Sequence, residues 1–163
     1  VGYYFYYCQP FRGSSLIYRT LARFYEEVDL LLTKGVERYL NDDFNLPRVL
    51  KHEGVIYGMA DRLVWVEREM MAGASLWQGL FYPSDFNSVR YLSGLSLGIT
   101  SDGAHDIVCY RSVLEYLGKR IDVKAALRQC RAYDPGSPEI SQHVRNCVSN
   151  EQAGSADVFM PRY

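Results

Sequence analysis

Residues 94–98 read Gly-Leu-Ser-Leu-Gly, and this stretch decides between two classes of fold. The pattern matches the nucleophile elbow of serine hydrolases, in which a buried strand ends at the serine and a helix starts directly after it. Here a turn-rich segment, residues 97–103, follows the serine, and the chain lacks the alternating strand and helix patterns of that fold. We therefore interpret Gly94 and Gly98 as small residues that permit tight packing.

A serine hydrolase is the alternative function. In that interpretation Ser96 is the nucleophile, and Asp102 and His105 complete a triad in the order serine, acid, histidine. The acid and the histidine are too close in sequence for the separate loops that usually carry them. The chain also has no Gly-rich phosphate-binding loop. We accordingly predict a protein that is not an enzyme and uses no cofactor.

The apolar spacing elsewhere predicts an all-α fold. Between Asn45 and Gly73, apolar residues and His52 recur at alternating steps of three and four, which is the period of an amphipathic helix. Asp122 and Ser137 offer further helix starts. The predicted helices cover about 16–34, 36–40, 46–72, 84–93, 104–118, 122–130 and 137–148. The acidic pairs Glu26–Glu27 and Glu67/Glu69 fall off the apolar stripes, so we expect them on solvated faces.

The whole chain, residues 1–163, is predicted to be one domain of five to seven helices with an aromatic arm at 1–13 and an irregular tail at 150–163. A chain of this length buries roughly 70% of its unfolded surface, which is enough for one core. The Tyr and Phe content of the arm favours an extended conformation. An exposed run of this kind is an association site. The predicted interaction residues are Tyr3, Tyr4, Phe5, Tyr6 and Tyr7.

Four cysteines with wide separations favour two disulfides, for which three connectivities are open. We favour Cys130 with Cys147, which would link two consecutive helices, and Cys8 with Cys109, which would tie down the arm. Buried free thiols are the alternative. No pair has the spacing of a zinc knuckle and no histidine lies at a ligand spacing from them, so we predict no metal site.

The charge balance argues against two classes of partner. Lys and Arg number 18 against 19 for Asp and Glu, so the chain lacks the basic excess of a nucleic-acid-binding protein. No apolar run reaches the 18 or more residues of a membrane-spanning helix. The sequence starts at Val1 without an initiator Met, which fits a processed secreted protein or a fragment. The fourteen Tyr suit half-buried surfaces and interfaces.

The run Cys109…Tyr116…Cys130 resembles the cysteine–tyrosine–cysteine modules of secreted effectors from gall-forming aphids, which carry two such modules where one is visible here. The resemblance implies a secreted interaction protein that acts on a host. We therefore predict a secreted, disulfide-linked, non-enzymatic helical protein. Its predicted partner is an unknown protein, a second copy of itself or a small apolar ligand. A Tyr-rich structural or storage protein is a further alternative.

Overall fold

The computed structural model describes residues 1–10, 14–41, 46–72, 75–83, 89–100 and 105–151, and these residues form mainly β-strands. The prediction of an all-α bundle is therefore wrong. The strands are β1 (Gly2–Cys8), β2 (Ile17–Glu27), β3 (Leu30–Asn41), β4 (Leu46–Met59), β5 (Arg62–Glu69), β6 (Leu76–Pro83), β7 (Tyr91–Ile99), β8 (Ile107–Gly118) and β9 (Ala132–Tyr133); the helices are α1 (Val123–Arg128) and α2 (Gln142–Val148).

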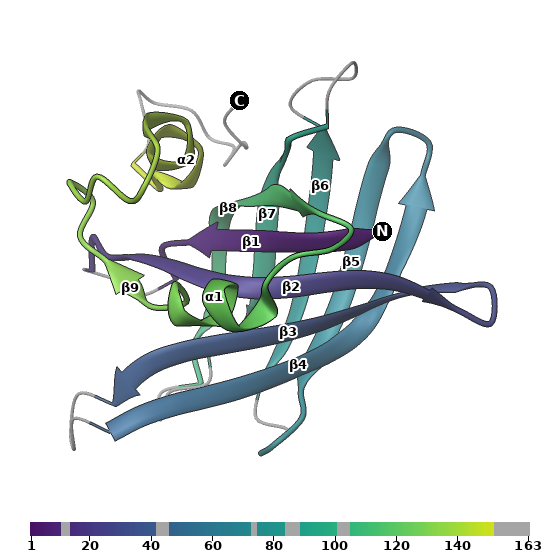
Figure 1. The fold of residues 1–163 in the computed structure, drawn as a ribbon, viewed down its shortest axis with the longest axis horizontal. Helices are drawn as coiled ribbons and strands as arrows, with labels where there is room; N and C mark the ends of the chain where they lie inside the picture. Colours follow the sequence, from purple (N-terminus) through teal and green to yellow (C-terminus); the bar gives the residue numbers. More distant parts are fainter. Residues whose placement is uncertain (11–13, 42–45, 73–74, 84–88, 101–104, 152–163) are drawn as a thin grey trace.

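Strands β1 to β8 close into an antiparallel barrel (Figure 1). Each strand pairs with the next one along the chain, and β1 also pairs with β8. Tyr4 marks the closure, because its Cα lies opposite Ala22 of β2 on one side and Tyr116 of β8 on the other. Closure gives every strand of the barrel a hydrogen-bonded neighbour on both sides, which removes free sheet edges.

The aromatic N-terminal segment is strand β1 in the barrel wall, and not an arm. Successive side chains of a strand point to opposite faces. Tyr4 and Tyr6 accordingly pack inside the barrel, whereas Phe5 and Tyr7 pack outside it against the C-terminal segment. Of the five predicted interaction residues, four are buried and Tyr3 is partly buried. The extended conformation is confirmed, but the side chains belong to two cores.

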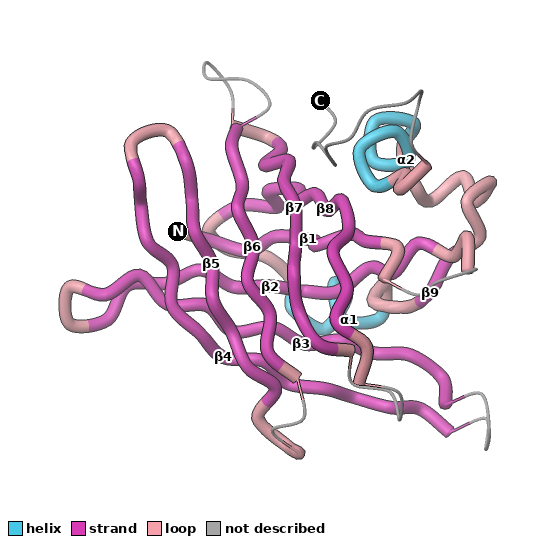
Figure 2. Tube along the Cα trace, turned by 180° about the vertical axis from the view of Figure 1, so that it is seen from behind, coloured by secondary structure: helices cyan, strands magenta, loops and turns pink. Residues whose placement is uncertain are grey.

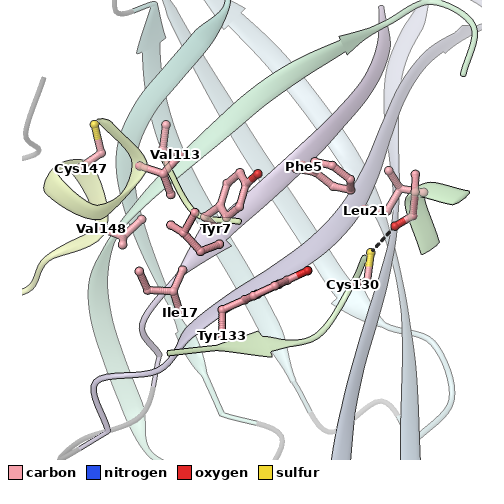
Figure 3. Packing of buried hydrophobic residues seen from close by; sticks show 12 residues of the cluster. Phe5, Tyr7, Ile17, Leu21, Val113, Cys130, Tyr133, Cys147 and Val148 are labelled. Atoms are coloured by element: carbon pink, nitrogen blue, oxygen red, sulfur yellow. Dashed lines mark hydrogen bonds between the residues drawn. The ribbon is translucent and has the colours of Figure 1, made fainter. Parts of the chain in front are cut away.

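A layer formed by α1, β9 and α2 covers the outer face of β1, β2 and β8 (Figures 1 and 3). Both helices were predicted, although α2 begins at Gln142 and not directly after Ser137, and local caps define where they begin. The Asp122 side chain accepts a hydrogen bond from the Ala125 backbone N–H, and Ser141 caps α2 in the same way through Val144. The apolar residues of this outer core are Phe5, Tyr7, Ile17, Leu21, Val113, Ala126, Cys130, Tyr133, Ile140, Val144, Cys147 and Val148.

Arg19 of β2 holds this layer against the barrel. Its side chain is 4% exposed, and its guanidinium lies 4.6 Å from the ring centroid of Tyr133 and 4.9 Å from that of Phe5. The same group donates to the Glu139 carbonyl at 2.6 Å and to the Tyr133 hydroxyl at 3.0 Å. One buried cation thus joins the barrel wall to two points, Tyr133 and Glu139, of the segment between α1 and α2.

The predicted disulfides are wrong, because all four cysteines are free. Cys130 and Cys147 belong to the outer core, but they lie on opposite sides of it (Figure 3). Cys8 faces the barrel interior, whereas Cys109 is exposed on the outer surface. The predicted disulfides therefore no longer support the prediction that the protein is secreted.

The longest predicted helix, 46–72, is the hairpin of β4 and β5 (Figure 2). Its chain reversal at Ala60 and Asp61 holds Ala60 at a φ of 53°, and Val28 and Asp29 between β2 and β3 have φ values of 48° and 65°. These are hairpin turns built without glycine, so the usual turn signal is absent from the sequence. Residues 84–88, 101–104 and 152–163, which include parts of the other predicted segments, lie outside the described residues.

The prediction that Gly94 and Gly98 permit tight packing is confirmed, although both lie in strand β7 and not beside a helix. A Cβ on Gly94 would lie 2.1 Å from the Leu80 carbonyl oxygen, and one on Gly98 would lie 2.1 Å from the Trp77 ring. Real Cβ atoms do not approach other atoms so closely, so both positions accept only glycine without rearrangement. The glycines of the 94–98 stretch therefore serve the contact between β6 and β7.

Candidate ligand-binding site in the barrel interior

Aromatic rings fill one half of the barrel interior. The Tyr4 ring lies 4.5 Å from Phe24 and 5.2 Å from Tyr116, and the Trp65 ring stacks on Phe81 at 5.6 Å. Aromatic pairs at such centroid distances attract each other beyond the area they bury. This half of the interior is a packed core.

Beside these rings the interior contains a cavity of about 50 Å³, whose wall combines polar and apolar side chains. Its wall includes Glu37, His52 and Glu67 together with the aromatic side chains of Trp65, Trp77 and Tyr110. A water molecule needs roughly 10–15 Å³ of such space, so the cavity holds a few waters or one small chemical group. Drug-sized ligands occupy pockets of roughly 300–1,000 Å³, which excludes a large ligand from the cavity in this conformation.

Glu37, His52 and Glu67 form an acid–imidazole–acid cluster on three adjacent strands. The strand register places Gly35 opposite His52 and Gly54 opposite Glu67, so the three side chains project inward side by side. His52 Nε2 lies 3.5 Å from Glu37 Oε2, and His52 Nδ1 lies 3.9 Å from Glu67 Oε1. The side chains of His52 and Glu67 are only 7% and 9% exposed. We call these three residues the acidic cluster.

Burial sets the protonation of the acidic cluster. It raises the pKa of Glu67 from the ordinary 4.5 to about 7, and the charge of His52 and the indole N–H of Trp65 oppose this only in part. Burial also disfavours a charged His52, but contact with Glu37 and the charges of Glu67 and Glu69 outweigh it, so the pKa of His52 is raised too. Near neutral pH, Glu67 is consequently divided between its neutral and ionised forms.

Two atoms of the acidic cluster are buried without a hydrogen-bond partner. These atoms are Oε2 of Glu67 and Nδ1 of His52. A Cβ placed on Gly35, which also lines the cavity, would lie 3.8 Å from Glu67 Oε2, so this oxygen is close to the open space. An unsatisfied buried polar atom costs roughly 1–3 kcal/mol. A bound group that donates a hydrogen bond there would recover this energy.

Hydroxyl groups line the opposite side of the cavity. The Tyr6 hydroxyl donates to Ser96 Oγ at 3.0 Å, and Ser96 Oγ lies 2.9 Å from Ser112 Oγ. The Tyr6 hydroxyl also lies 3.4 Å from that of Tyr110, and burial raises the pKa of both tyrosines. Both phenols are therefore neutral and act as hydrogen-bonding groups.

The structure does not bring the predicted hydrolase triad together as a described site. Ser96 lies within the antiparallel strand β7, with no helix directly after it, and its hydroxyl is shared with Tyr6 and Ser112. His105 is exposed, and Asp102 lies outside the described residues. His52 lines the same cavity as Ser96, but the described contacts of its imidazole are with the acidic cluster.

Sequence reasoning found only part of this site. It placed His52 in the core or at its boundary, which is confirmed, and it placed Glu67 and Glu69 on a solvated face, which is wrong because both are buried. Glu26 and Glu27 are exposed as expected. In residues 65–69 the alternating Trp-x-Glu-x-Glu pattern was the available signal for an inward-facing acidic strand.

The fold and the cavity define the class as an up-and-down β-barrel with a small interior pocket that contains buried carboxylates. Comparisons with protein-family models, with curated proteins and with solved structures found no match to the chain. The described residues contain no group of three or more His, Cys, Asp or Glu arranged to hold a metal ion. None of the helices in the described part of the chain has the length and apolar character needed to cross a membrane.

Proposed function

We propose that the protein is a binding protein, and not an enzyme, that takes a small organic molecule into the interior cavity of its barrel. The observation that carries this proposal is the buried Glu67 oxygen, which has no hydrogen-bond partner and lies beside the interior cavity. Eight-stranded barrels have an interior just wide enough to be filled by side chains or to hold one small ligand. Here aromatic rings fill part of the interior, and a small cavity remains beside the acidic cluster.

The residues around the cavity support binding without chemistry. Aromatic walls supply apolar contact area, whereas the acidic cluster and the hydroxyls of Ser96 and Tyr110 supply hydrogen-bonding groups that orient a ligand. Among the described contacts around the cavity, the Ser96 hydroxyl meets the hydroxyls of Tyr6 and Ser112 and not a base. The predicted partner class of a small apolar ligand is thereby revised to a small molecule with a polar group.

Gly35→Ala tests this proposal because it adds one methyl group to the cavity wall. The new Cβ would lie 3.4 Å from the His52 Cβ, which is an ordinary contact, so the fold should tolerate it. Gly58→Ala on the same sheet is the matched control, because a Cβ there meets nothing within 4 Å.

The measurement is a fragment screen followed by two-dimensional NMR and tryptophan fluorescence. Both tryptophans of the chain, Trp65 and Trp77, line the cavity, so their emission reports its occupancy. We expect hits that shift the amide signals of Gly35, Glu67 and Ser96, and whose affinity falls at least tenfold in Gly35→Ala but stays unchanged in Gly58→Ala. A screen without hits at these residues, or hits insensitive to Gly35→Ala, would overturn the proposal.

A further inference from the structure

The charge of the cavity wall indicates which ligands enter it. Glu37 and Glu67 bring two carboxylates to the wall, and Glu69 adds a third nearby negative group that acts on His52. Among the described residues that line the cavity there is neither a lysine nor an arginine. Once Glu67 is ionised, an anionic ligand would therefore meet net negative charge, because His52 offsets at most one of the carboxylates, in a place where water screens it poorly.

The cavity also offers aromatic surfaces beside the carboxylates. Trp65 and Trp77 line it, and the Trp77 ring lies 5.4 Å from the ring of Tyr110. Aromatic faces attract cations, and tryptophan does so most strongly. Carboxylates combined with tryptophan faces are the environment that an ammonium group prefers.

From these two observations, and resting on the proposed binding function, we infer that the bound molecule is a small organic ammonium ion whose N–H donates to Glu67 Oε2. The ammonium group supplies both the missing donor for the unpartnered oxygen and a counter-charge for the two carboxylates. The small volume restricts the enclosed part of the ligand to the ammonium group and the few carbons next to it.

Binding of such a cation releases protons to the solvent. The groups that face Glu67 are His52 of β4 and Glu37 of β3, and Glu69 of its own strand acts on His52. The ammonium ion favours ionised Glu67 and neutral His52, so each loses its bound proton more readily when the site is occupied. Because the pKa of Glu67 is about 7, its ionised fraction rises roughly tenfold between pH 6 and pH 8. The affinity for the cation should rise about as much.

Three probes with equal carbon chains separate charge from size: n-propylammonium, 1-propanol and propionate. We expect tryptophan fluorescence to show binding of n-propylammonium at pH 8 at least tenfold tighter than that of 1-propanol, and no saturable binding of propionate. The affinity for n-propylammonium should fall about tenfold at pH 6. Calorimetry in buffers of different ionisation enthalpy should show net proton release.

Glu67→Gln keeps the shape of the side chain but removes its charge. It should weaken n-propylammonium binding at pH 8 at least tenfold and leave 1-propanol binding within about twofold. Glu53→Gln is the control, because Glu53 is an exposed carboxylate on β4. Circular dichroism verifies that both variants are folded, and the comparison of the three probes on the unaltered protein does not depend on any variant.

The outcomes separate this inference from the proposed function. If 1-propanol, propionate or a neutral fragment binds at Gly35 and Ser96 while n-propylammonium does not, the cation inference fails and the binding function stands. Equal affinity of n-propylammonium for the protein and for Glu67→Gln would also overturn the inference. If neither these probes nor the fragment library binds in the cavity, the binding function itself fails.

Discussion

The imidazole of His52 faces the carboxylate of Glu37 across neighbouring strands of the barrel, with 3.5 Å between Nε2 and Oε2. On its other edge, Nδ1 faces Glu67. His52 is thus held between two acids inside the protein, where each charge strongly affects its neighbours. This arrangement has measurable consequences for stability as well as for ligand binding.

The stability of the protein should fall as the pH rises from 5.5 to 8. The folded-state pKa of Glu67, about 7, lies above its ordinary value of 4.5, so the folded protein binds more protons than the unfolded chain in this range. The pKa of His52 is also raised, so its stabilising contribution is present below its ordinary 6.5 and is lost as the pH rises through the raised value. Glu67 alone should account for a loss of roughly 2 kcal/mol in the free energy of unfolding.

Urea unfolding at several pH values measures this slope. Glu67→Gln should flatten the slope and be more stable than the unaltered protein at pH 8, because no charge is then buried at that position. Glu53→Gln should keep the original slope. An unchanged slope in Glu67→Gln would contradict the buried, raised-pKa state of Glu67.

Gly54→Ala should destabilise the barrel, whereas Gly58→Ala on the same strand should not. A Cβ on Gly54 would lie 2.0 Å from the Val66 carbonyl oxygen and 2.6 Å from the Glu67 Cα, and these are backbone atoms that cannot move aside cheaply. We expect a loss of roughly 1–3 kcal/mol for Gly54→Ala and at most about 0.5 kcal/mol for Gly58→Ala. Chemical denaturation measures both values, and equal effects would contradict the register of β4 and β5.

Arg19→Lys should loosen the C-terminal layer. Lysine keeps the charge but lacks the planar group that lies against Phe5 and Tyr133 and donates to Glu139. We expect a loss of roughly 1–3 kcal/mol in the free energy of unfolding and faster proteolytic cleavage within residues 119–141. Arg23→Lys is the control on β2, because Arg23 is exposed. Equal cleavage rates in the two variants would argue against Arg19 as the clamp.

Thiol titration should count one reactive cysteine in the folded protein and four after denaturation without a reductant. Cys109 is exposed, whereas Cys8, Cys130 and Cys147 are 3%, 4% and 1% exposed. Partial burial raises the pKa of Cys109, so its reaction should be slower than that of a free thiol. Cys109→Ser should abolish the native reaction, and fewer than four thiols in the denatured protein would restore the disulfide hypothesis.

Ser96 should not react with a fluorophosphonate probe. Its hydroxyl is buried and shared with Tyr6 and Ser112, and the strand that carries it lacks the turn that exposes a hydrolase nucleophile. Ser96→Ala should cost roughly 1–2 kcal/mol through the lost hydrogen bonds. Covalent labelling of the protein that disappears in Ser96→Ala would revive the hydrolase alternative.

Local signals were sufficient for the two helices but not for the barrel. Asp122 caps α1 within its own segment, so no distant contact was needed to find that helix. In β2, by contrast, Leu21 packs in the outer core and Ala22 in the barrel interior, so both faces of the strand are covered. A strand with two buried faces loses the alternation that identifies it, and its apolar residues then also fit a helical period.

The acidic cluster was out of reach of sequence analysis for a different reason. Glu37, His52 and Glu67 come from three strands, and only the pairing of Gly35 with His52 and of Gly54 with Glu67 brings them together. A change of one residue in register would turn these side chains to the outer surface. The sequence shows which acidic and histidine residues are present, but only the strand pairing shows that these three lie together.

The pairing of β1 with β8 means that the barrel can close only late in folding. During synthesis the aromatic first strand leaves the ribosome long before its partner, since Tyr4 must wait for Tyr116. Contacts between residues so distant along the chain form slowly. Until then β1 pairs only with β2. A chain interrupted before Gly118 would therefore expose the aromatic side chains of β1 and leave one edge of this strand unpaired.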